Sequence, residues 1–150
     1  MKTIITNVEA LRMQLIPKAT IDQIKLDEGF RSKPYQCTAG KITIGYGRNI
    51  EDNGITKSEA ENLLLNDVKT AQIELLNTFD WFAKLNGARQ GVLINMAFNL
   101  GLPRLKKFKK MLSALSKSDY HEASKQMLDS RWAVQVGERA NRLAKQITEG

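Results

Sequence analysis

Three side chains that can take part in acid–base chemistry lie in the segment from Ile24 to Asn53. Glu28 carries a carboxyl group, Cys37 a thiol and Thr43 a hydroxyl, with eight and then five residues between them. A carboxylic acid can protonate a leaving group, while a thiol and a hydroxyl can orient an attacking water. The glycines that punctuate the segment are typical of tight turns and of backbone that a ligand approaches closely. The segment therefore predicts an enzyme in which the three side chains converge on one cleft.

A short helix is predicted to position the acid. Thr20 is a suitable N-cap for a helix from Ile21 to Glu28, which presents the carboxyl group at its C-terminal end. The negative pole of the helix and burial against Phe30 or Tyr46 would both disfavour the ionised carboxylate. Glu28 is therefore expected to hold its proton as a general acid.

A strand is predicted to position the hydroxyl. After a Pro-containing loop and a turn at Gly40, the residues from Lys41 to Tyr46 alternate in the manner of a β-hairpin strand. Ile42 and Ile44 share one face, so Thr43 is expected to point to the other face, into the cleft.

The remainder of the chain has the apolar periodicity of helices. Thr56 and Glu59 have the spacing of a capping box, which predicts a helix from Lys57 to Asn77, about 30 Å long, joining a small β-containing lobe to a helical lobe. An accessory helix is expected within residues 1–19 and the β lobe within about 30–55. The helical lobe, 80–150, is expected to contain a short turn at Asp80–Lys84 and helices at Gly87–Leu100, Leu105–Ser116, Tyr120–Leu128 and Val136–Thr148. The expected fold is α+β but mostly α, in a single domain over residues 1–150 with a cleft between the lobes.

Composition restricts the class of protein. The chain has 150 residues, 42% of them hydrophobic and 26% charged, which is ordinary usage for one globular domain with a core. No apolar run approaches the ~18 residues of a membrane span, and charges interrupt the N-terminal apolar stretch, so secretion by the general route is not predicted. One cysteine and one histidine predict neither a disulfide nor a metal site, and no cofactor is expected.

The motif around the three side chains resembles that of the phage-type lysozymes, the endolysins of glycoside hydrolase family 24. The residues that carry the resemblance are EGFRxxxYxCTAGxxTIGYGR, then GITKSEAENLLLNDV, ARQGVLINMAFNLG, and DSRW followed by GERANR. Four blocks in the same order make the resemblance specific, and they cover the chain from about Ile21 onward. The resemblance implies a lysozyme-like fold and hydrolysis of the β-1,4 bond between N-acetylmuramic acid and N-acetylglucosamine in peptidoglycan.

The family also implies roles for individual residues. It carries a Glu-Asp-Thr triad, in which Glu28 would be the general acid and the other two would hold the attacking water, with inversion at the sugar carbon. This chain departs from that pattern because Cys37 replaces the aspartate. We expect Cys37 to act as a variant of that residue, with its pKa lowered by Lys33, Lys41 or Arg48.

Residues of the helical lobe are implied to serve the same reaction. By resemblance Phe98, Asn99 and Gln126 would contact saccharide, and Arg139 would support Glu28. A core position is an equally good interpretation of Phe98, whereas Met111 and Trp132 are expected to pack in the core.

The net charge of +7 predicts an anionic partner. Lys106, Lys107, Lys109 and Lys110 alternate with apolar residues, which favours a core-facing helix with a solvated basic back, or else attraction to an anionic envelope. No nucleic-acid-binding motif accompanies the charge, so nucleic acid is not expected as a partner. The chain is expected to be a monomer.

Two alternatives remain open besides the endolysin. A lytic transglycosylase cleaves the same bond with one acid but forms an anhydro sugar and needs no water-positioning partner. A cationic protein that disrupts the wall or membrane needs no catalysis. As an endolysin, the protein would be made in the host cytoplasm and reach the periplasmic wall through a separate membrane pore.

Overall fold

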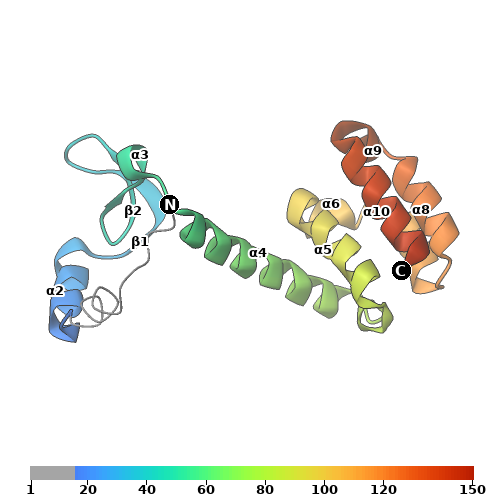
Figure 1. Cartoon of the computed structure of the whole chain (residues 1–150), viewed down its shortest axis with the longest axis horizontal. Helices are drawn as coiled ribbons and strands as arrows, with labels where there is room; N and C mark the ends of the chain where they lie inside the picture. The colour runs from blue at the N-terminus through green and yellow to red at the C-terminus, as the bar shows by residue number, and fades with distance from the viewer. Residues whose placement is uncertain (1–15) are drawn as a thin grey trace, which may run out of the picture. The chain divides into compact units, whose positions relative to one another are not determined.

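The computed structural model describes residues 16–150, which separate into two compact units (Figure 1). The first unit extends to Glu59 and the second runs from Ala60 to Gly150. The accessory helix predicted near the N-terminus falls mostly outside the described residues. Lys18 and Ala19, which were assigned to that segment, belong to the following helix instead.

The first unit is built on a three-stranded antiparallel sheet that follows helix α2 (Lys18–Glu28). The strands β1 (Arg31–Gln36), β2 (Ile42–Gly45) and β3 (Arg48–Asn49) lie in the order β1-β2-β3. The prediction of a loop around Pro34 is wrong, since this proline lies within β1. β1 is an edge strand with irregular pairing between Arg31 and Tyr35, where a proline is tolerated because no ladder hydrogen bond is lost.

Two elements of the first unit were not predicted. β3 follows a two-residue turn at Tyr46 and Gly47, and α3 (Ile50–Asn53) begins directly after it. The side chain of Asn49 caps α3 by accepting a hydrogen bond from the backbone N–H of Asp52 at 3.1 Å. These elements are too short for apolar periodicity to reveal them.

Helix α4 (Lys57–Thr78) begins at the predicted capping box. The hydroxyl of Thr56 accepts from the N–H of Glu59 at 3.2 Å, and the carboxylate of Glu59 accepts from the N–H of Thr56 at 2.7 Å. Arg48 adds an ion pair to Glu59 at 2.9 Å, so the start of α4 is tied to β3. The predicted long helix is confirmed to within one residue of its C-terminal end.

The second unit is helical and contains the buried apolar residues found among the described part of the chain. Helix α10 (Glu138–Glu149) packs on α5 (Gly87–Leu100), α8 (Tyr120–Leu128) and α9 (Arg131–Val136). Helix α7 (Lys109–Ser116) packs on α8, so the core lies among these helices. Phe82, Leu93, Met96, Met127 and Ile147 are among its fully buried side chains. The elements are η1 (Phe82–Lys84), α5 (Gly87–Leu100), α6 (Leu102–Leu105), α7 (Lys109–Ser116), α8 (Tyr120–Leu128), α9 (Arg131–Val136) and α10 (Glu138–Glu149).

The predicted bounds of α5 and α8 are confirmed, whereas two other helices differ from prediction. The helix expected at Leu105–Ser116 is interrupted, because α6 ends at Leu105 and α7 begins only at Lys109. The helix expected at Val136–Thr148 is α10, and Gly137 separates it from the unpredicted α9. Gly137 has a φ of +55°, a conformation that ends a helix and favours glycine.

The fold class is confirmed as mostly α with a small antiparallel sheet. In the described part of the chain, no helix combines the length and apolar character that a bilayer span requires. The single domain with a cleft between its lobes stays a prediction.

Candidate active site

The carboxyl group of Glu28 lies against the β2–β3 turn. A Cβ atom placed on Gly47 would be 2.5 Å from Oε2 of Glu28, so only glycine leaves room for the carboxylate there. Gly47 also has a φ of +77°, which suits the turn and disfavours side chains. The end of α2 and the turn of the hairpin therefore meet at the predicted acid.

The expected burial of Glu28 by aromatic rings is wrong. Phe30 and Tyr46 instead pack on each other with ring centroids 5.3 Å apart, and Lys25 lies over the Tyr46 ring at 5.6 Å. Glu28 itself is exposed. Its carboxyl group is therefore accessible at the mouth of the hairpin.

Thr43 lies in the middle of β2, paired with Tyr35 of β1 and Asn49 of β3. It is only 3% exposed, the lowest fraction described in the first unit, so it is far less open than predicted. Its hydroxyl donates a hydrogen bond to the carbonyl oxygen of Lys41 at 3.1 Å. This bond uses the single proton of the hydroxyl, so its oxygen has acceptor capacity left but no further proton to donate.

Cys37 follows β1 at the start of the β1–β2 turn. Its N–H donates to the carbonyl oxygen of Lys41 at 2.9 Å, and its own carbonyl accepts from Gly40 at 2.8 Å. The pKa of its thiol is lowered from the ordinary value by the backbone N–H of Lys41, then by the hydroxyl of Thr43 and the backbone N–H of Ala39. Thr43 and Cys37 are therefore neighbours, as predicted from their spacing.

The cause of this lowered pKa differs from the one predicted. The ammonium group of Lys41 binds Glu51 and Asp52, and the guanidinium of Arg48 binds Glu59. These cations are already neutralised, so the thiolate is favoured by hydrogen-bond donors of the turn.

The three side chains lie along one strand and its two turns. Glu28 lies against the β2–β3 turn. Cys37 lies at the start of the β1–β2 turn, and Thr43 lies within β2, between the two turns. The four residue-to-residue steps from Thr43 to Gly47 span at most about 13 Å at ~3.3 Å per step. This length is an upper limit on the backbone separation between Thr43 and the turn that contacts the acid.

In the second unit, Phe98 and Arg139 line the same pocket. Phe98 is 47% exposed, so it is not a core residue. The pocket has a volume of about 280 Å³, and its other walls are Leu64, Val68, Gly91, Ile94 and Asn95. Arg139 is held by Asn95, whose side-chain and backbone oxygens accept from it at 2.9 and 3.3 Å. Support of Glu28 by Arg139 would join the two units and stays a prediction.

Asn99 has a structural partner in the indole of Trp132. The Nε1 of Trp132 donates to Oδ1 of Asn99 at 2.8 Å, and Trp132 is 5% exposed, which confirms it as a core residue. The Nδ2 group of Asn99 has no bond to the described residues that would prevent a contact with ligand.

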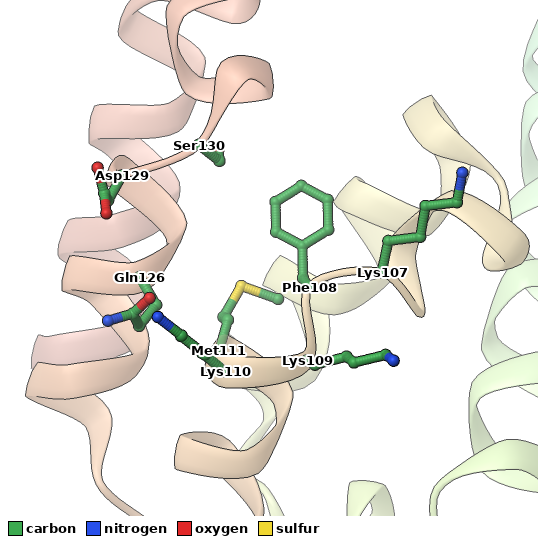
Figure 2. A pocket seen from close by; sticks show the side chains of 8 residues that line it. All are labelled: Lys107, Phe108, Lys109, Lys110, Met111, Gln126, Asp129 and Ser130. Atoms are coloured by element: carbon green, nitrogen blue, oxygen red, sulfur yellow. The ribbon is translucent and has the colours of Figure 1, made fainter.

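Gln126 lines a second pocket, of about 380 Å³, near α7 and α8. Figure 2 shows the Phe108 ring and the Met111 thioether between Lys107 and Lys109 on one side and Gln126 on the other. Met111 is 1% exposed and packs in the core, as predicted. Gln126 donates to Glu122 at 2.6 Å, which orients its amide. The pocket was not predicted, because Lys107 and Phe108 lie in the unpredicted break between α6 and α7.

Among the described residues no cluster of His, Cys, Asp and Glu side chains is arranged to hold a metal ion.

Comparison with known proteins identifies the family of the chain. The phage lysozyme family model matches residues 25–147. Probable T4-type lysozyme 1 of Dictyostelium discoideum is 32% identical over 158 positions, covering 86% of this chain and 93% of that protein. An endolysin of Acyrthosiphon pisum secondary endosymbiont phage 1 is 33% identical over 73% of this chain and 74% of its own length. The pre-baseplate central spike protein Gp5 of Enterobacteria phage T4 is 32% identical over 86% of this chain but only 27% of its own length.

The family match spans both units, including the hairpin with Glu28, Cys37 and Thr43 and the helices of the second unit. The chain therefore belongs to the phage lysozyme family and is a lysozyme, an enzyme that hydrolyses peptidoglycan.

Proposed function

We propose that this lysozyme is an endolysin that hydrolyses the β-1,4 bond between N-acetylmuramic acid and N-acetylglucosamine. The observation that carries the proposal is the placement of Glu28, Thr43 and Cys37 along one strand and its turns. A solvent-accessible acid at one end and a thiol–hydroxyl pair at the other match the two halves of glycoside hydrolysis.

In this proposal Glu28 donates its proton to the glycosidic oxygen as the bond from that oxygen to the sugar carbon breaks. A water held by Cys37 and Thr43 forms the new bond to that carbon from the opposite face. The proton that the water loses passes to the Cys37 thiolate, which the turn's hydrogen-bond donors favour. The sugar carbon is thereby inverted without a covalent enzyme intermediate.

The test compares purified wild-type protein with Glu28→Gln and Asp27→Asn on isolated peptidoglycan. Both substitutions convert an acid to its amide, at adjacent positions, but only Glu28 contacts the hairpin turn. Glu28→Gln is expected to lose at least about 10²-fold in rate, in line with loss of a general acid, while Asp27→Asn retains activity. Full activity of Glu28→Gln would overturn the assignment.

The same digests identify the reaction by product mass. Hydrolysis leaves muramic acid with a reducing end, whereas a transglycosylase leaves an anhydro ring that is lighter by one water. We expect hydrated products, and release of anhydro products would replace hydrolysis by transglycosylation.

The burial of α7 argues against a purely membrane-disrupting function. Its apolar residues Met111, Leu112 and Leu115 are buried in the core, so the helix presents lysines and serines but no apolar face to solvent. A helix without an exposed apolar face cannot insert into a bilayer. This agrees with the prediction of a core-facing helix with a solvated basic back.

We also propose a role for that basic back in retaining the enzyme at the anionic cell envelope. The segment 102–117 contains Arg104 and five lysines but no acidic residue, and it accounts for most of the net charge. Association of the inactive Glu28→Gln protein with isolated envelopes should weaken steeply as salt rises from 50 to about 200 mM. Salt-independent association would remove this role. We further propose that the enzyme is made in the host cytoplasm and reaches the wall through a separate membrane pore. Lysis of cells that occurs only when a pore protein is co-expressed would support this route.

A further inference from the structure

The backbone of Lys41 is shared by the two residues assigned to water. Its carbonyl oxygen accepts from the N–H of Cys37 at 2.9 Å and from the hydroxyl of Thr43 at 3.1 Å. Its N–H is the largest cause of the lowered pKa of the Cys37 thiol. A shift of the Lys41 backbone would therefore displace both Cys37 and Thr43.

Helix α3 holds Lys41 and Ile42 through two acidic side chains. Glu51 accepts from the ammonium group of Lys41 at 3.3 Å with one oxygen and from the N–H of Ile42 at 3.0 Å with the other. Asp52 accepts from the same ammonium group at 2.9 Å. Glu51 therefore binds two consecutive residues, Lys41 just before β2 and Ile42 at its first position.

The helix is in turn fixed to the other side of the same strand. Asn49 pairs with Thr43 in the sheet. Its side-chain amide both donates to the carboxylate of Asp52 at 2.9 Å and accepts from the Asp52 N–H at 3.1 Å. Contacts thus run in a closed circuit from Thr43 through Asn49 and Asp52 to Lys41, and back to Thr43.

We propose that Glu51 is a positioning residue, assisted by Asp52, which holds the Lys41–Thr43 segment so that the Cys37 thiol and the Thr43 hydroxyl face the attacking water. The inference rests on the proposed function for the part that water plays. No contact with substrate is assigned to Glu51.

The expected energy of the ion pair between Lys41 and Glu51 favours a positioning role for Glu51 over a role in stability. The side chains of Lys41 and Glu51 are 40% and 44% exposed, and exposed ion pairs add little to the stability of a fold. The bond from Glu51 to the Ile42 N–H is different, because it fixes backbone next to reacting groups. A misplacement of about 1 Å at a reacting group can cost on the order of 10²-fold in rate.

The test uses Glu51→Ala and Glu51→Gln, with Glu74→Gln as the matched control on the exposed surface of α4. Glutamine keeps an oxygen that can accept from Ile42 but loses the charge, whereas alanine loses both. Since Cys37 is the sole cysteine of the chain, the pH dependence of its alkylation reports the thiol pKa directly.

The two roles predict changes of opposite sign in the pKa of the Cys37 thiol when Glu51 is replaced. If Glu51 acts only as a nearby negative charge, its removal stabilises the thiolate, and the thiol pKa falls in both variants. If Glu51 positions the Lys41 N–H, the pKa rises in Glu51→Ala, because the thiolate loses an ordered donor, and changes less in Glu51→Gln. We expect the second pattern, with kcat reduced about tenfold or more in Glu51→Ala, partly restored in Glu51→Gln, and KM little changed.

A thiol pKa that falls or stays constant in a folded Glu51→Ala protein would overturn the inference, as would unchanged kcat. Circular dichroism and thermal unfolding of each variant establish folding, and Asp52→Asn provides a second, milder perturbation of the same circuit. If Cys37→Ala proves fully active, the proposed role of the thiol fails, yet the alkylation measurement still decides whether Glu51 positions it.

Discussion

The Cα atom of Gly47 and the carboxylate of Glu28 are in such close contact that a Cβ atom would lie 2.5 Å from Oε2. The residue that ends α2 is thereby placed at the turn between β2 and β3. Since β2 also carries Thr43, a single hairpin positions the acid relative to the thiol–hydroxyl pair.

This contact predicts that Gly47→Ala impairs catalysis more than Gly45→Ala. Both glycines have positive φ, so each substitution carries a backbone cost of about 1–2 kcal/mol. A Cβ at Gly45 meets no atom within 4 Å, whereas at Gly47 it displaces the Glu28 carboxylate. We expect about 10- to 100-fold lower kcat for Gly47→Ala than for Gly45→Ala on isolated peptidoglycan. Equal kcat values in the two folded variants would mean that the placement of Glu28 does not matter.

Substitutions at Cys37 test its proposed role with water. Cys37→Asp supplies the carboxylate that the family has at this position and should retain activity. Cys37→Ala removes the polar group and should lower kcat by on the order of 10²-fold. Turnover is measured on the same substrate for both, and undiminished kcat in the alanine variant would exclude Cys37 from the reaction.

The lowered pKa of Cys37 predicts its reactivity toward alkylating agents. Because only the thiolate reacts, the alkylation rate should reach half its maximum at a pH below the ordinary thiol value of 9.0. Thr43→Val removes a hydroxyl that favours the thiolate and should move that midpoint to higher pH. Iodoacetamide labelling followed by mass spectrometry across pH 5–10 checks both statements. A midpoint that Thr43→Val leaves in place would contradict the contact between the two side chains.

Asn99 is predicted to contribute to stability through its bond with Trp132. Asn99→Ala leaves the indole N–H of a nearly buried side chain without its acceptor, at a cost of about 1–3 kcal/mol. Thermal unfolding should show a lower Tm, by about 2–4 °C for each kcal/mol in a chain of this size. Asn141→Ala, at an exposed position of α10, serves as the control. If Asn99 also contacts saccharide, KM rises in addition, whereas an unchanged Tm would show that the bond adds nothing to stability.

The sequence alone was sufficient to predict the long helices and the strand that carries Thr43. Capping signals and apolar periodicity are local, so the Thr56–Glu59 box predicted the start of α4, and periodicity predicted the bounds of α5. The motif spacing placed Cys37 and Thr43 on one hairpin, because residues so close along the chain, with a turn between them, return to neighbouring strands, while convergence of these two with Glu28 on one cleft stays a prediction.

Only the tertiary structure decided what surrounds those side chains. Phe30 packs on Tyr46 rather than on Glu28, and Lys41 pairs with Glu51 and Asp52 rather than with the Cys37 thiol. These choices depend on which donors and acceptors meet once β3 and α3 have folded back, and such short elements leave no periodic pattern in the sequence. The residue types therefore determined which chemistry is available, while the fold determined which partners contact each group. The reason is that a partner must be close in space, and spacing along the chain does not determine that distance.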